Sequence, residues 1–200
     1  MALLEMPLGH HKSHCISDTL RQDGSVMIRW LLLIPVLLFS SCATCWRGGE
    51  PLRSTELTSL QSVAKDLRQA KNIQVYHGLA HPLRDPKIYA EQLRTVPHRA
   101  FAGFEFHQKP ENVSSPRIKE IVDLYCDPNS HQALASPKST CAGFHPDYAL
   151  VWSNAEGQRV LQICYGCHEW KYFGPGGVLH TDINEPAYFE KITRWLPPKP

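Results

Sequence analysis

The sequence predicts an α+β fold, in which a small antiparallel β-meander is covered by helices. Two hairpin signals predict the meander, because apolar or β-branched runs flank the turn sequences Asn154-Ala155-Glu156-Gly157 and Gly174-Pro175-Gly176-Gly177. Apolar residues at helical spacing precede and follow these runs, and they predict helices that cover the strands. The strands of the meander are expected at 148–153, 158–164, 170–173 and 178–182.

Capping residues and apolar spacing predict four helices. Serine is a favoured helix cap and proline is favoured at the first helical position, so helices are expected to begin at Ser54, Asp85-Pro86, Ser115-Pro116 and Glu185. The first should continue to about Ala70, and the second should end near Thr95 because Val96 precedes a proline. The expected buried faces contain Leu57, Leu60, Ala64 and Leu67, then Ile118, Ile121, Val122 and Tyr125, then Tyr188 or Phe189, Ile192 and Trp195.

Two shorter apolar segments lie between these helices. Residues 73–76 predict a short strand, and the aromatic segment 99–107 (RAFAGFEFH) predicts one longer strand. We therefore expect residues 54–200 to form a single α+β domain, a size that suffices to bury a core.

The segment from Met27 to Cys42 (MIRWLLLIPVLLFSSC) has the features of an export signal. It begins with a positive charge, continues with ten apolar residues from Trp30 to Phe39, and ends in small residues before the cysteine. The alternative is a membrane-spanning helix, but that requires about twenty apolar residues. The segment resembles the signal of bacterial lipoproteins. The resemblance implies cleavage before Cys42 and lipidation of its thiol.

This resemblance divides the chain and predicts its location. Translation is expected to start at Met27, which leaves residues 1–26 upstream; their three histidines and one cysteine could alternatively form a metal-binding tract. Residues 27–41 are the expected signal peptide, and residues 42–53 the tether to the membrane. The mature protein is expected to be lipid-anchored in the cell envelope, facing the periplasm. Ala43 favours the outer membrane, by the sorting pattern of the lipoproteins that the signal resembles.

Composition and motifs restrict the function classes. The formal net charge is +2 and no run of Lys or Arg is present, so no nucleic-acid partner is expected. The chain contains no G-x-S-x-G, H-E-x-x-H or Walker pattern. We therefore expect no catalytic residue, and a binding role rather than an enzyme. Eight of the eleven histidines follow Cys42. Two of them, His77 and His81, share a loop that could line a site, although we expect it at the surface.

Cys164-Tyr165-Gly166-Cys167-His168 matches C-x-x-C-H, the attachment motif of c-type haem. Resemblance to that family implies thioethers at Cys164 and Cys167 and an iron ligand at His168. No methionine follows Met27, so a histidine would have to be the sixth ligand. A single-haem electron carrier is therefore one alternative function.

The same cysteines also suit a structural metal or a disulfide. A C-x-x-C turn, with Gly166 permitting the reversal, directs two thiolates at one ion, and Cys141 and His145 could complete a tetrahedral zinc set. In an oxidising compartment, Cys126, Cys141, Cys164 and Cys167 could instead form disulfides. A thiol-disulfide redox protein is a further alternative.

Antiparallel pairing of the first hairpin predicts that the candidate Cys and His ligands lie close together in space. Pairing about the turn at 154–157 places Cys164 opposite Asp147, so the segment from Cys141 to His145 should pass close to the C-x-x-C turn. The stretch from Cys141 to Leu196 resembles an uncharacterised family of small bacterial exported proteins that has a C-x-G-F-H-P-D-Y element and a C-x-x-C hairpin. That resemblance implies no activity. The expected function is an exported lipoprotein with a structural Cys/His cluster.

Overall fold

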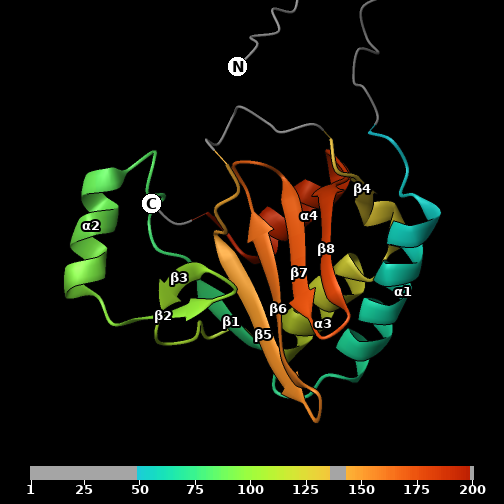
Figure 1. The fold of residues 1–200 in the computed structure, drawn as a ribbon, viewed down its shortest axis with the longest axis horizontal. Coiled ribbons are helices and arrows are strands. Elements are labelled where there is room, and N and C mark those ends of the chain that lie inside the picture. Colours follow the sequence, from blue (N-terminus) through green and yellow to red (C-terminus); the bar gives the residue numbers. More distant parts are fainter. Residues whose placement is uncertain (1–48, 136–142, 199–200) are drawn as a thin grey trace, which may run out of the picture. The chain divides into compact units, whose positions relative to one another are not determined.

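The computed structural model describes residues 49–135 and 143–198, and an antiparallel sheet forms its centre (Figure 1). Within these residues the sheet has six strands in the order β1-β5-β6-β7-β8-β4. The predicted α+β class is confirmed, and so are both hairpins of the meander. The strands are β1 Gln74–His77, β4 His131–Ala133, β5 Tyr148–Asn154, β6 Gly157–Cys164, β7 Glu169–Gly174 and β8 Gly177–Ile183.

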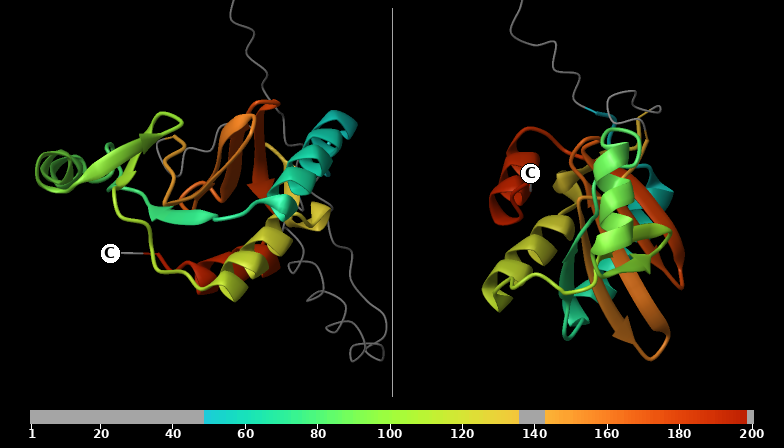
Figure 2. Two further views of the ribbon diagram at one scale, coloured as in Figure 1. Left: turned by 90° about the horizontal axis from the view of Figure 1, so that it is seen from below. Right: turned by 90° about the vertical axis from the view of Figure 1, so that its left-hand side faces the viewer.

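Three of the four described helices cover one face of the sheet. Figure 2 shows α3 and α4 side by side beneath the strands, and α1 packs against α3 and β8. All four begin within two residues of the positions that the sequence predicts. The helices are α1 Ser54–Gln69, α2 Pro86–Thr95, α3 Ser115–Tyr125 and α4 Ala187–Trp195, and a short 3₁₀ turn spans Pro128–Ser130.

The main core lies between these helices and the sheet. Alternate residues of the strands, such as Leu161, Ile163 and Trp170, point toward α1, α3 and α4 and are fully buried. Burial of each such side chain contributes about 1.5–3 kcal/mol. The residues predicted to be buried on α1 and α3 are largely buried. Of the residues predicted to be buried on α4, Ile192 is fully buried. The other predicted residues of α4, Tyr188, Phe189 and Trp195, are half-buried.

A separate hairpin covers part of the opposite face. Strands β2 His98–Phe101 and β3 Phe104–His107 pair with each other, and Phe101 and Phe106 pack on the sheet at β1, β5 and β6. The prediction of one strand over 99–107 was wrong. The chain reverses at Ala102-Gly103, where both residues have positive φ, 47° and 87°. The aromatic residues on both sides of this turn gave it the appearance of a continuous strand.

A buried histidine joins β4 to α3 and β8. The His131 imidazole packs against the rings of Tyr125 and Trp170, its Nε2–H donates to the Tyr125 carbonyl oxygen at 2.6 Å, and its Nδ1 lies 2.7 Å from the Thr181 hydroxyl. Burial lowers the pKa of His131 to about 4. The imidazole is therefore neutral in the folded domain at neutral pH, where its two nitrogens are both hydrogen-bonded.

His131 should make the domain sensitive to acid. Its folded pKa of about 4 lies below the unfolded value of about 6.5, so the unfolded chain takes up the proton first as the pH falls. The free energy of unfolding should be greatest above pH 6.5 and decrease by roughly 3 kcal/mol from this group by pH 4. Chemical denaturation at several pH values measures the decrease. His131→Gln should remove it, while His98→Gln, an exposed control, should not; equal decreases in both variants would contradict the account.

Candidate functional site

The register of β5 and β6 positions the predicted site. Tyr148 pairs with Ile163, and the Asp147 N–H donates to the Ile163 carbonyl oxygen at 2.8 Å. Cys164 therefore follows directly at the end of β6, opposite Asp147, as the turn at 154–157 predicts. The Asp147 carboxylate continues this connection, because its Oδ2 accepts the Tyr165 N–H at 2.6 Å. The start of one strand is thus fixed to the turn that follows the other.

Cys164 is a buried thiol that accepts backbone hydrogen bonds. Its side chain is free and only 1% exposed. The Cys167 N–H donates to its sulfur at 3.3 Å, and the backbone N–H of His145 donates to the same sulfur. Burial raises the pKa of Cys164 to about 11, although the two N–H donors oppose the increase. The sulfur therefore holds two chain segments together as a neutral thiol.

The turn between β6 and β7 differs from the prediction in one respect. The sequence predicts that Gly166 permits the reversal, but the residue with a left-handed backbone is His168, with φ 56°. Its ring stacks on Phe189 with ring centroids 3.8 Å apart, and its Nδ1 pairs with the Glu185 carboxylate. His168 therefore joins the turn to α4, and these contacts accompany its unusual backbone conformation.

Cys167 does not bond with Cys164. It is disulfide-bonded, whereas Cys126 and Cys164 are the free cysteines of the described part. Its sulfur is 3.5 Å from the Gly143 carbonyl oxygen, which brings the segment before His145 to the turn. Cys126 lies elsewhere, beneath α1, with its sulfur 3.8 Å from the Ala64 carbonyl oxygen. Cys141 and Cys42 lie outside the described residues.

The predicted zinc set is brought together only in part. The His145 backbone N–H donates to Cys164, whereas the Nε2–H of its imidazole donates to the Leu79 carbonyl oxygen at 2.9 Å. Burial, together with neighbouring His81, lowers the pKa of His145. Within residues 49–135 and 143–198, no three His, Cys, Asp or Glu side chains are arranged to hold a metal ion. The four-residue set that includes Cys141 stays a prediction.

The C-x-x-C-H residues do not fit attached haem. Both thiols would have to be available for thioethers, yet Cys164 is buried and Cys167 is disulfide-bonded. His168 is held between Glu185 and Phe189.

A cavity of about 250 Å³ adjoins Cys164. It lies among the end of β1, the loop that follows, α2 and the start of β5. For His77 and His81, sequence reasoning favoured a surface loop over the alternative that they line a site; both are half-buried and line this cavity. The separation of these two histidines from His145 along the chain did not indicate that all three would line one cavity. The lining residues are His77, Gly78, Leu79, Ala80, His81, Arg84, Asp85, Ile88, Gln92, His145, Asp147, Cys164 and Gly166.

Comparison with known proteins adds no relative. No family model, curated protein or solved structure matches the chain. None of the helices formed by the described residues combines the length and apolarity that crossing a membrane requires.

The buried thiols should be unreactive in the folded protein. Burial raises the pKa values of Cys126 and Cys164 to about 11, so at pH 8 about one thiol in a thousand is ionised and able to attack an alkylating reagent. Iodoacetamide at pH 8, followed by peptide mass spectrometry, should modify neither residue without denaturant and both in denaturant. Rapid modification of Cys164 in the native protein would contradict its placement.

Proposed function

We propose that this chain is an exported, lipid-anchored protein of the bacterial cell envelope, and that its described domain is a non-catalytic binding module. The proposal of a non-catalytic module rests on Cys164, which is a buried thiol hydrogen-bonded to two backbone N–H groups. The first part rests on the signal-like segment that ends at Cys42. The membrane, through the lipid, is the expected partner.

A structural role for the cysteines is better supported than thiol-disulfide exchange. Exchange requires an accessible thiolate, which redox enzymes obtain by lowering the pKa of the attacking cysteine. Cys164 has the opposite properties, since it is 1% exposed and burial raises its pKa to about 11. With Cys167 disulfide-bonded elsewhere, the C-x-x-C pair is not a dithiol. We therefore favour a structural disulfide site over the redox alternative.

The contacts around the turn support this structural role. Asp147 accepts the Tyr165 N–H, and the Tyr165 hydroxyl donates to the Leu196 carbonyl oxygen at 2.5 Å. His168 contacts α4 through Glu185 and Phe189. The turn is thus attached to β5 on one side and to α4 on the other. Such a turn gives the adjoining cavity a rigid wall, which suits a binding site.

Lipidation of Cys42 would provide the membrane attachment. A single acyl chain binds membranes only marginally, and two lipid signals give stable anchoring. The lipoprotein signals that residues 27–42 resemble lead to a cysteine with three acyl chains, which would exceed this requirement. Anchoring would place the domain in the periplasm, at the outer membrane in a cell with two membranes.

Replacement of Cys42 should release the protein from the membrane. Cys42→Ser removes the thiol that the lipid would modify, so the variant should lose metabolic labelling with palmitate and leave the membrane fraction. Cys45→Ser is the matched control, because it alters a cysteine three residues further along the tether. Membrane fractionation and labelling of both variants measure the effect. Continued labelling and membrane retention of Cys42→Ser would refute the lipid anchor.

A further inference from the structure

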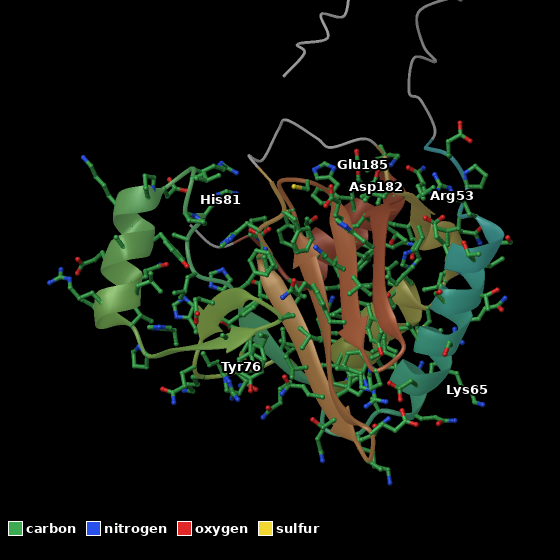
Figure 3. The ribbon with its side chains drawn as sticks, viewed as in Figure 1. Arg53, Lys65, Tyr76, His81, Asp182 and Glu185 are labelled. Carbon is green, nitrogen blue, oxygen red and sulfur yellow. The ribbon has the colours of Figure 1, made fainter. Side chains whose placement is uncertain are left out.

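The cavity beside Cys164 contains a hydrogen-bond donor for which the described residues provide no acceptor. His81 lies between α2 and the edge of the sheet (Figure 3), and its Nδ1 accepts the N–H groups of Leu83 at 3.1 Å and Arg84 at 3.3 Å. The proton of the neutral ring is therefore on Nε2. This atom is buried and has no hydrogen-bond partner among the described residues. A buried N–H without an acceptor is unfavourable, so a ligand that supplies one is favoured.

The other charged groups of the cavity have both signs. Arg84 lines the cavity, and its charge lies near enough to Asp147 to oppose the effect of burial on that carboxyl group. The acidic residues Asp147 and Asp85 line it as well. Two acidic residues make the cavity a poor site for a simple anion. A molecule with a negative and a positive group can satisfy both kinds of residue.

Size and apolar lining restrict the ligand further. The cavity volume of about 250 Å³ lies below the 300–1,000 Å³ that is usual for sites of drug-sized ligands. Leu79 and Ile88 line it, and Ile88 is 55% exposed, so its side chain is available for an apolar contact. Among the described residues, α2 has no fully buried side chain. A small ligand could therefore gain contacts from α2 that the protein itself leaves unmade.

We propose that this cavity binds a small α-amino acid as its zwitterion, with the carboxylate at His81 Nε2–H and Arg84 and the ammonium group at Asp147. The proposal assigns a ligand class to the binding module proposed above and rests on that function. It involves no covalent step. The apolar contacts at Leu79 and Ile88 favour a short aliphatic side chain, for which L-alanine is the probe.

The experiment titrates the full exported protein in detergent and follows the imidazole signals of His81 by NMR. L-Alanine should shift them saturably, with a dissociation constant of about 1 mM or below. Propionate lacks the ammonium group and 2-propylamine lacks the carboxylate, so each should bind at least tenfold more weakly. Absence of a saturable shift with alanine would overturn the proposal. So would equal binding of propionate, because the site would then not recognise the positive group.

Two variants and one control test the assigned contacts. His81→Asn retains an acceptor where Nδ1 lies, so it can still bind the N–H groups of Leu83 and Arg84, but it removes the Nε2–H. Affinity for alanine should fall roughly tenfold, as expected for one lost hydrogen bond. Asp147→Asn retains an acceptor for Tyr165 and removes the charge, and a similar loss is expected. His98→Asn, at an exposed position, should bind as the native protein does.

The outcomes separate this proposal from the proposed function. Unchanged affinity in both His81→Asn and Asp147→Asn would overturn the site even if alanine binds elsewhere. Failure of alanine to bind would leave the fractionation of Cys42→Ser and the alkylation of Cys164 as before. Those results would then still support a lipid-anchored domain with a structural cysteine site.

Discussion

The two backbone hydrogen bonds to the sulfur of Cys164 are the contacts on which the site depends. One comes from Cys167, within the turn after β6, and the other comes from His145, just before β5. A buried thiol at this position therefore joins the two ends of the β5–β6 hairpin opposite to its turn. Burial disfavours a reactive thiolate, but it suits a thiol that serves as a hydrogen-bond acceptor between two chain segments. A neutral sulfur needs no counter-charge.

The hairpin also positions the cavity that adjoins this sulfur. Its register places Asp147 beside the turn, and the His145 ring consequently lies against His81 from the loop after β1, with ring centroids 4.7 Å apart. The buried thiol of Cys164 and the histidines His81 and His145 therefore line the same cavity. This arrangement explains how a motif that suggests chemistry can serve mainly to support the wall of a neighbouring cavity.

Local signals in the sequence predicted most of the fold. The Asn154–Gly157 turn fixed both strands and their register, and hence the position of Cys164. Strand β4 was missed because three residues, His131–Ala133, are too few for a pattern, and it pairs with β8 far along the chain. The cavity was missed for a similar reason. Its walls come from segments that are distant in sequence, and no periodic pattern in the sequence indicates that the rings of His81 and His145 are in contact.

Amide hydrogen exchange at His145 and Cys167 tests the central claim most directly. If the sulfur of Cys164 accepts both N–H groups, these two amides should exchange as slowly as those of the core strands, because opening them requires the hairpin end to separate. Cys164→Ala should accelerate both together, while amides of the turn at Ala102-Gly103 keep their native rates. Fast exchange of both amides in the native protein would contradict the account, since the turn would then be an open loop.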